Sequence, residues 1–404
     1  MLLRENRLRG TNFDFVLGHL TKHWGSLPWR ETYRRLLYMP RFLNIEFVAG
    51  KCNLKCRMCV GLQSPEYPNR LTTMAADSFR HMLTAATTVG FVTLSSGDSD
   101  PLLHPDLDTT IDLAREQHDC LDLFTNGQAL GPRTCRIMVE SQAVNMINVS
   151  IDAATPATYR RLRGASFDRL LGKLEMLVGM KNERRTRLPW LSLSFVAMAD
   201  NIHELPDFVR LAQRFSAARV YVEDLIGWQD RPSDNRPATE SPRYFEYTAE
   251  ATRLAAEAGI SLLLPERLLN APASPESGPP VVMPAEPTGT ESHAGKLSCC
   301  SWLNGVWVNQ DGTLDPCCLI HRIVDMGDVR GGPLLANEKY MRVKSLLAEG
   351  KVFEACRNQR NCPYVQQQQS AGIPLRTIEP ENLGDCMIAV KDNHTPAPQP
   401  ATVG

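Results

Sequence analysis

The segment Lys51–Val60 (KCNLKCRMCV) places three cysteines, Cys52, Cys56 and Cys59, within eight residues. It follows an apolar run, FLNIEFV at 42–48, whose β-branched and aromatic residues predict a short buried strand. Three thiolates at the end of one strand can converge on one inorganic centre. A structural zinc ion takes four protein ligands, whereas a cubane of four irons takes one thiolate per iron. Three cysteines therefore favour a [4Fe–4S] cluster with one iron open to another ligand.

The overall composition excludes several classes of protein. The chain has 404 residues, 43% of them hydrophobic and 22% charged, with a net charge of −1. This is globular composition, and the length predicts two domains with room for a third small one. The near-zero charge argues against nucleic acid as a partner. No apolar run approaches the roughly 18 residues of a membrane span, and the N-terminus lacks the apolar core of a secretory signal. We therefore expect a cytoplasmic protein without a membrane partner, whose 12 cysteines serve metal or redox chemistry.

Residues 42–225 repeat one pattern. Short apolar runs alternate with segments of helical periodicity, and the runs lie at 42–48, 91–94, 121–124, 146–151, 191–196 and 219–222. Helical periodicity is clearest at 78–87, 107–116 and 205–215. Six strand–helix repeats predict an α/β fold with a parallel sheet, curved or closed. Functional residues in such folds lie at the carboxyl ends of the strands.

The CxxxCxxC spacing of Cys52, Cys56 and Cys59 resembles the signature of the radical S-adenosylmethionine (SAM) enzymes, although Met58 stands where the family often has an aromatic residue. The resemblance implies a partial (β/α)6 TIM-like barrel and a [4Fe–4S] cluster whose open iron binds SAM. It also implies reductive cleavage of SAM to a 5′-deoxyadenosyl radical, which abstracts hydrogen from the substrate. A reducing partner such as flavodoxin or ferredoxin would supply the electron.

The segment SSGDSDPLLHP at 95–105 resembles the GGEP segment of that family. Gly97 is kept, Asp98 and Ser99 replace the expected glycine, and Asp100 stands where glutamate is usual. The resemblance implies that this backbone contacts the amino group of SAM, and Gly97 would permit that close approach. A plain turn is the alternative interpretation.

Two later segments also resemble family motifs. Thr125-Asn126-Gly127 resembles the TNG sequence that lies beside SAM, and Ser150-Ile151-Asp152 followed by TPATYRRLRG resembles the family segment that ends in an R-G pair. The resemblance implies that Asn126 and Ser150 line the SAM site. It also implies that Arg163 binds the SAM carboxylate, which a guanidinium fork suits. The alternatives are a common Asn-Gly turn and a solvated helix residue.

Cysteines return near the C-terminus. A predicted hairpin joins VWVN at 306–309 to LDPCC at 314–318 through Asp311-Gly312, and a helix is expected at 340–349. This stretch resembles the SPASM domain, or its shorter form, twitch, which binds auxiliary clusters. A full SPASM domain has seven cysteines and two clusters, but Phe353 and Gln366 stand where two of them would be.

We therefore expect one auxiliary [4Fe–4S] cluster. The resemblance implies four ligands for it: Cys299 (or its neighbour Cys300), Cys317, Cys356 and Cys362. Four thiolates leave no iron open, which suits electron transfer. A structural zinc site with the same cysteines is the alternative.

The expected organisation has five parts: an N-terminal helical extension at 1–40, a radical SAM core at 41–225, a connecting segment with a Pro-rich loop at 226–296, a SPASM/twitch domain at 297–389 and a disordered tail at 390–404. The expected activity is dehydrogenation or epimerisation of a small-molecule or sugar-like natural-product intermediate. The first 40 residues are short for the leader-binding domain of some peptide-modifying relatives. A peptide-modifying (RiPP maturase) enzyme and a non-catalytic iron–sulfur or zinc protein are the alternatives.

Overall fold

The computed structural model describes residues 40, 42–50, 52–59, 72–85, 91–95, 99–117, 120–225, 242–265, 268, 299, 305–317, 323–332, 334–358, 362–370 and 372–386. The expected N-terminal extension (apart from Pro40), the Pro-rich loop and the C-terminal tail lie outside the described residues.

The described strands build one nine-stranded sheet in the order β11-β10-β1-β4-β5-β6-β7-β8-β9. Its strands are β1 (Phe42–Glu46), β4 (Phe91–Ser95), β5 (Cys120–Thr125), β6 (Val144–Ser150), β7 (Trp190–Ala197), β8 (Arg219–Asp224), β9 (Ser261–Leu263), β10 (Gly305–Val308) and β11 (Leu314–Asp315). All neighbouring pairs are parallel except β10 and β11. Two short pairs lie outside this sheet: antiparallel β2 (Val48–Ala49) with β3 (Thr72–Thr73), and parallel β12 (Lys351–Val352) with β13 (Arg376–Thr377).

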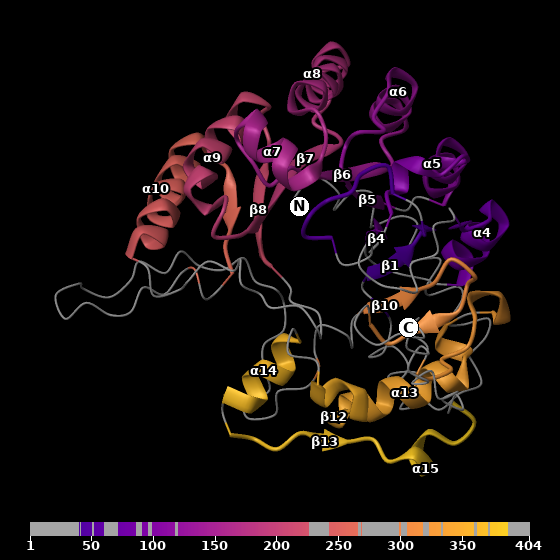
Figure 1. The fold of residues 1–404 in the computed structure, drawn as a ribbon. Helices are drawn as coiled ribbons and strands as arrows, with labels where there is room; N and C mark the ends of the chain where they lie inside the picture. The colour runs from indigo at the N-terminus through magenta and orange to yellow at the C-terminus, as the bar shows by residue number, and fades with distance from the viewer. Residues whose placement is uncertain are drawn as a thin grey trace, which may run out of the picture.

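Helices cover the outer face of this sheet in an arc (Figure 1). They are α4 (Ala76–Ala85), α5 (Leu107–Glu116), α6 (Pro132–Ser141), α7 (Pro156–Arg163), α8 (Phe167–Glu183), α9 (Leu205–Arg214) and α10 (Pro242–Ala258). The C-terminal part contains α13 (Glu338–Ala348), α14 (Pro363–Ser370) and α15 (Pro380–Leu383). Short 3-10 turns are η2 (Pro101–Leu103), η3 (Ile202–Glu204), η4 (Val329–Gly331), η5 (Leu334–Ala336), η6 (Glu354–Asn358) and η7 (Gly384–Cys386).

The two faces of the sheet differ in polarity, as β7 shows. Leu191, Leu193 and Phe195 belong to the hydrophobic core. Because side chains alternate along a strand, Ser192 and Ser194 face the opposite side. That opposite face is the inner face of the partial barrel, and it carries polar residues toward the carboxyl ends of the strands.

The predicted α/β fold with a partial (β/α)6 barrel is confirmed. Each of the six apolar runs forms a strand, and the segments at 107–116 and 205–215 form α5 and α9 almost to the residue. Two features were not predicted. Both α7 and α8 lie between β6 and β7, and the C-terminal hairpin extends the main sheet, since β10 pairs in parallel with β1. An open barrel exposes the edge of β1, and the hairpin covers that edge.

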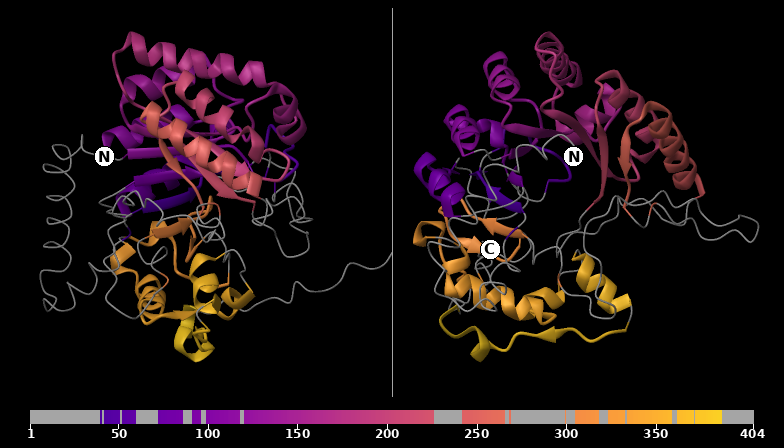
Figure 2. Two further views of the ribbon diagram at one scale, coloured as in Figure 1. Left: turned by 90° about the vertical axis from the view of Figure 1, so that its left-hand side faces the viewer. Right: turned by 180° about the vertical axis from the view of Figure 1, so that it is seen from behind.

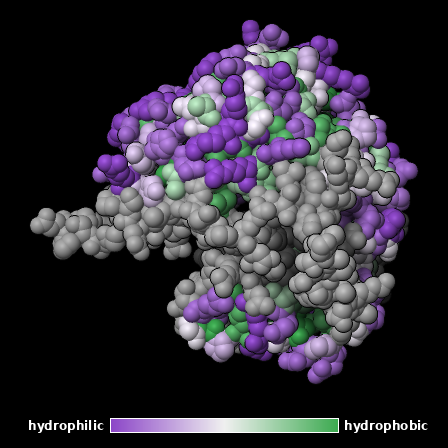
Figure 3. All heavy atoms as spheres, in the orientation of Figure 1, coloured by the Kyte–Doolittle hydropathy of each residue, from purple (hydrophilic) through white to green (hydrophobic). Residues whose placement is uncertain are grey.

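The helices α5–α10 and the C-terminal elements α13–α15 lie on opposite sides of the sheet (Figures 1 and 2), whereas α4 lies next to η4 of the C-terminal part. The inner face therefore looks toward the C-terminal part of the chain. The helix-covered side is largely hydrophilic in the space-filling view (Figure 3). Among the described residues, no helix combines the length and the apolar character that a membrane span requires.

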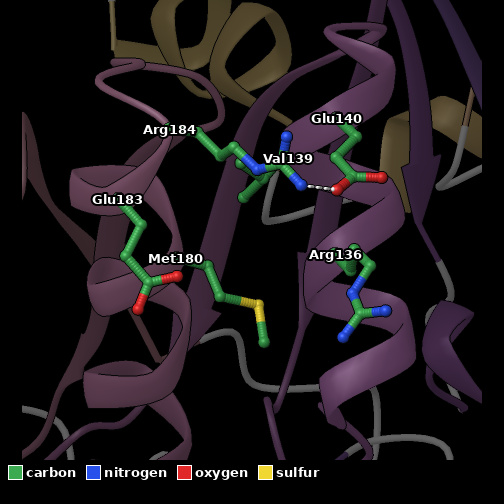
Figure 4. Close-up of a pocket in the computed structure, with 6 residues that line it drawn as sticks. All are labelled: Arg136, Val139, Glu140, Met180, Glu183 and Arg184. Carbon is green, nitrogen blue, oxygen red and sulfur yellow. Dashed lines mark hydrogen bonds and ion pairs between the residues drawn. The ribbon is translucent and has the colours of Figure 1, made fainter.

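A surface pocket of about 180 Å³ lies between α6 and α8 (Figure 4). Its walls are Arg136, Val139, Glu140, Met180, Glu183 and Arg184. Arg184 forms an ion pair with Glu140 across it. None of these residues was predicted to bind a cofactor or metal, and the pocket lies in the outer helical layer.

The turn after β5 generates a stability prediction. Gly127 has φ +73°, and a Cβ there would lie 2.7 Å from Leu170 Cδ1 and 3.0 Å from Val149 Cγ1. Gly127→Ala should therefore lower the free energy of unfolding by about 1–3 kcal/mol, measured by denaturant titration. Gly172→Ala is the control, because Gly172 lies inside α8 and an added methyl carbon there would meet no atom within 4 Å. It should raise stability by up to about 1 kcal/mol, and equal effects of the two changes would contradict the prediction.

Candidate functional site

The loop that carries the first three cysteines is tied to the end of α7. The Arg57 backbone N–H donates to the carbonyl oxygen of Leu162 at 2.8 Å, and the Cys59 N–H donates to the Cys56 carbonyl at 3.1 Å. The Leu54 N–H donates to Cys52 Sγ at 3.5 Å. These contacts curl residues 52–59 into a compact turn at the carboxyl edge of the sheet.

The structure brings the three predicted cysteines together. Burial, together with the charges of Asp100, Cys56 and Cys59, raises the pKa of Cys52 to about 11. Burial also raises the pKa of Cys56, to which Cys59 contributes while Arg163 opposes it. Each thiol thus lies within electrostatic reach of the other two, as ligands of one cubane must.

A cubane and a single metal ion require different arrangements of these thiols. Within the part of the chain that the structure describes, no three His, Cys, Asp or Glu side chains are gathered tightly enough to hold one metal ion. In a cubane each thiolate binds its own iron, so the thiolates need not surround one point. The grouping of Cys52, Cys56 and Cys59 fits that requirement.

Arg163, the last residue of α7, lies directly beside the cysteine loop. Its Nε donates to Asp152 Oδ2 at 2.5 Å, its Nη2 forms an ion pair with the same oxygen, and its Nη1 donates to Cys56 Sγ at 3.5 Å. Its side chain is only 12% exposed, so the alternative of a solvated helix residue does not describe it. Burial works against the charge of Arg163, yet Asp152 and Cys56 keep its pKa above the ordinary value.

Asp152 holds this arginine from a strained position at the end of β6. Its φ of +63° is in the left-handed region, which non-glycine residues seldom adopt. The Val196 N–H donates to its Oδ1 at 2.8 Å, and Asn201 Nδ2 donates to its carbonyl oxygen at 2.9 Å. Such backbone strain persists only where surrounding contacts fix it, and it concentrates at functional sites.

Asp100 links two predicted motifs. It is 1% exposed and accepts hydrogen bonds from Thr125 Oγ1 at 2.8 Å, from Asn126 N at 2.7 Å and from Leu102 N at 2.9 Å. Burial raises the pKa of its carboxyl, and these hydrogen bonds oppose that rise. Asp100 thus fixes the GGEP-like segment against the TNG turn. Gly97 and Asp98 of the same segment lie outside the described residues.

Asn126 and Ser150, the other predicted cofactor residues, lie at neighbouring strand ends. Asn126 Nδ2 donates to Asn53 Oδ1 at 2.7 Å and to Cys52 Sγ at 3.6 Å. Ser150 Oγ accepts a hydrogen bond from Ser194 Oγ at 3.1 Å. Asn126 is therefore joined to the cysteine loop, while Ser150 belongs to a pair of hydroxyls on the inner face.

Glu223 was missed by the sequence analysis, which ended the sixth strand at Val222. It lies on β8 opposite Val196, and it faces the same side as Tyr221. Burial raises its pKa to about 7, Asp152 adds to the rise, and Arg163 opposes it. A half-buried carboxyl that titrates near neutrality can take or give a proton. The signal that could have found it was an acidic residue at the carboxyl end of a strand.

The four predicted auxiliary ligands also come together. Cys299 precedes β10 in the chain, and Cys317 follows β11. Cys356 lies in η6, and Cys362 directly precedes α14. Burial raises the pKa of Cys299, and so do the charges of Cys362, Cys317 and Cys356. Burial likewise raises the pKa of Cys356 to about 12, and Cys362 contributes. Cys300, the alternative ligand, lies outside the described residues.

A buried lysine beside these cysteines was also missed. Lys344 on α13 is 0% exposed, and its Nζ donates to the carbonyl oxygen of Gly305. Its Nζ lies 5.5 Å from the ring centroid of Tyr340. Burial lowers its pKa to about 7, whereas Cys299 and Cys317 raise it. No local pattern marks this residue, because Lys344 occupies one position of an otherwise ordinary amphipathic helix.

Comparison with known proteins agrees with this geometry. Residues 47–212 match the family model of the radical SAM superfamily. The chain is 27% identical over 167 residues to mycofactocin maturase MftC of Mycobacterium ulcerans, which covers 41% of this chain and 42% of that protein. It is 23% identical over 177 residues to a probable GTP 3′,8-cyclase of Methanococcus vannielii, covering 44% of this chain and 56% of that protein. The matches thus span about half the length of these curated relatives.

Solved structures show the same fold. Streptococcus suis SuiB bound to S-adenosylmethionine superposes with a TM-score of 0.60 at 15% identity, covering 84% of this chain and 75% of that one. Native anSMEcpe with bound AdoMet superposes with a TM-score of 0.54 at 13% identity, covering 82% of this chain and 95% of that one. The fold of these structures and the match of residues 47–212 to the radical SAM model thus agree, and members of that superfamily use a [4Fe–4S] cluster and SAM.

The buried ion pair generates a prediction. Asp152→Asn keeps the shape of the side chain and tolerates the left-handed backbone, but it leaves the Arg163 charge buried without its partner. The free energy of unfolding should fall by about 3 kcal/mol or more in denaturant titration. Asp200→Asn is the control, since Asp200 pairs with Arg57 and Arg161 near the surface. That change should cost at most about 1 kcal/mol, and a larger loss than for Asp152→Asn would contradict the argument.

The raised pKa of Glu223 predicts a pH-dependent stability. Folding raises the pKa from 4.5 to about 7, so the folded state binds the proton more tightly, and stability is lost as pH rises through this interval. Glu223→Gln stays neutral and should exceed the wild type in free energy of unfolding by about 2 kcal/mol at about pH 8. The difference should shrink toward about pH 5. Glu257 is an exposed residue of α10, so Glu257→Gln should show no such pH trend. A parallel trend in that variant would refute the raised pKa of Glu223.

Proposed function

We propose that this chain is a radical SAM oxidoreductase that cleaves SAM reductively and abstracts a hydrogen atom from its substrate. One observation carries the proposal: Cys52, Cys56 and Cys59 lie within electrostatic reach of each other beside the buried Arg163–Asp152 pair. A cubane with an open iron and SAM would supply the radical chemistry there. The protein's part is to hold, orient and shield these groups.

Several side chains have roles in holding SAM under this proposal. Arg163 offers a guanidinium for the SAM carboxylate, and Asp152 fixes its orientation. Asp100 acts through the backbone by fixing the TNG turn. Gly97, Asp98, Asn126 and Ser150 stay proposed cofactor contacts, on the strength of the motifs that contain them.

The second cysteine group supports a net oxidation. Cys299, Cys317, Cys356 and Cys362 offer four thiolates, so an auxiliary [4Fe–4S] cluster there would have no open iron and would serve electron transfer. A flavodoxin or ferredoxin would deliver the electron that starts the reaction. Epimerisation, which returns a hydrogen atom from a thiol, is the other outcome that these cysteines allow.

The inner face of the barrel supports a polar small-molecule substrate. Polar and ionisable side chains occupy it at successive strands, namely Asp122, Asn148, Ser150, Ser192, Ser194, Arg219 and Glu223. Asn148 is 1% exposed, and its Nδ2 has no hydrogen-bond acceptor among the described residues. Such a lining fits hydroxyl or amino groups, as in a sugar-like intermediate, better than an aliphatic chain.

A peptide substrate is the second candidate. Its support comes from relatives: three similar proteins are named mycofactocin maturases, and SuiB has been solved bound to the precursor peptide SuiA. A polar inner face accepts a peptide's polar side chain as well as a sugar. The substrate class thus needs a direct binding comparison.

Anaerobic reconstitution with iron and sulfide, followed by SAM and dithionite, tests the central proposal. The wild type should bind about eight irons per chain and release 5′-deoxyadenosine. The triple change Cys52→Ala, Cys56→Ala and Cys59→Ala should keep about four irons and release none. The matched change of Cys317 and Cys362 to Ala should also lose about four irons but still release 5′-deoxyadenosine.

Other results would decide against the proposal. A wild type with about eight irons and no 5′-deoxyadenosine would indicate a non-catalytic iron–sulfur protein. If the second cysteine group binds zinc and SAM is still cleaved, only the proposal of an auxiliary cluster would be wrong. A deuterated polyol or a deuterated peptide that transfers its label to 5′-deoxyadenosine would identify the substrate class.

A further inference from the structure

Lys344 is an unusual residue for its position. The face of α13 that packs inward contains apolar and aromatic side chains, among them Tyr340, Val343 and Leu347. Lys344 lies among them at 0% exposure. Lysine is almost never fully buried unless its charge is compensated, because an ammonium loses its hydration there.

Lys344 contacts the hairpin that leads to one cysteine of the second group. Its Nζ donates to the carbonyl oxygen of Gly305, the first residue of β10. In the β10–β11 hairpin, Trp307 pairs with Asp315 and Val308 with Leu314. β11 ends at Asp315, two residues before Cys317, so the second strand of this hairpin leads directly to that cysteine. The ammonium therefore lies between α13 and the first residue of the hairpin, within electrostatic reach of this cysteine.

A second cysteine lies within reach of the same charge. Lys344 acts electrostatically on Cys299, and Cys299 in turn acts on Cys317, Cys356 and Cys362. Four thiolates around a [4Fe–4S] core leave it with net negative charge, which reduction increases. Burial lowers the pKa of Lys344, but the negative charges of Cys299 and Cys317 oppose that fall and favour its protonated form. A buried cation nearby favours the reduced form of a cluster, since Coulomb interactions are strong in a low-dielectric interior.

We propose that Lys344 is a positioning residue of the auxiliary cluster, whose buried ammonium raises the reduction potential of that cluster. This inference rests on the proposed function, because it requires a cluster on Cys299, Cys317, Cys356 and Cys362. Lys344 also joins the cluster site to the main sheet, because β10 pairs with β1 from Phe42 to Ile45. A raised potential makes the cluster a better acceptor for an electron released by an oxidised substrate.

Redox titration of the reconstituted full-length chain, followed by electron paramagnetic resonance, tests the inference. Lys344→Met removes the charge and keeps the length and apolar stem of the side chain. It should shift one of the two cluster midpoints to lower potential by at least a tenfold change in the reduction equilibrium, which is about 59 mV for one electron. The other cluster should be unchanged. Lys339→Met is the matched control: Lys339 lies on the same helix but pairs with Asp325 at the surface, and its loss should move neither midpoint.

Iron content separates the possible failures. A wild type with about four irons would overturn the auxiliary cluster itself, and with it part of the proposed function. A wild type with about eight irons whose midpoints do not respond to Lys344→Met would overturn only the role of Lys344.

Variants with altered assembly are also informative. If Lys344→Met loses the auxiliary irons, Lys344→Gln and Lys344→Arg decide the reason. Retention of iron and potential in the arginine variant alone shows that the charge is required. Loss of iron in both variants shows that only the shape of lysine matters, and this would overturn the inference.

Discussion

The buried ion pair between Arg163 and Asp152 connects the cysteine loop to the sheet. Asp152 lies two residues after β6, Arg163 is the last residue of α7, and the guanidinium reaches Cys56. A pair this deeply buried contributes less net stability than its Coulomb energy suggests, because both ions lose hydration. Its value lies in geometry. Because the Arg163 guanidinium contacts both Asp152 and Cys56, it fixes the position of the cysteine loop relative to the carboxyl ends of the strands.

That pair depends in turn on a polar network beneath α7. Glu204 is buried and accepts hydrogen bonds from the backbone N–H groups of Ala154 at 2.6 Å and Thr155 at 3.1 Å. These groups precede the first turn of α7, where a carboxylate also complements the helix dipole. Asn201 holds the Asp152 carbonyl from the same loop. The strained backbone of Asp152 is thus fixed by residues about 50 positions later in the chain, which explains how an unfavourable φ persists.

The parts of the structure that the sequence predicted are those with local causes. Apolar periodicity located six strands, and the cysteine spacings identified both thiol groups before any contact was known. The parts it missed arise from long-range contacts. The parallel pairing of β10 with β1 joins residues more than 250 positions apart, and no local pattern marks it. Glu223 and Lys344 stand out only through their burial and neighbours, which a sequence does not display. Gly97 and Asp98 stay predictions from the motif, outside the described residues.

Each cysteine group has a buried cationic side chain nearby, Arg163 for the first group and Lys344 for the second. The surroundings of these two cations differ, and this difference affects the reduction potential expected for each cluster. Near the first group, the charge of Arg163 is offset by Asp152, a fully buried carboxylate in direct contact. Near the second group, the ammonium of Lys344 meets a backbone carbonyl, an aromatic ring and the field of Cys299 and Cys317. A neutralised cation changes a cluster potential little, whereas a buried ammonium beside thiolates raises it. Under the proposed function, this difference would make the second centre the more oxidising of the two, which is the order that a net oxidation of substrate would require.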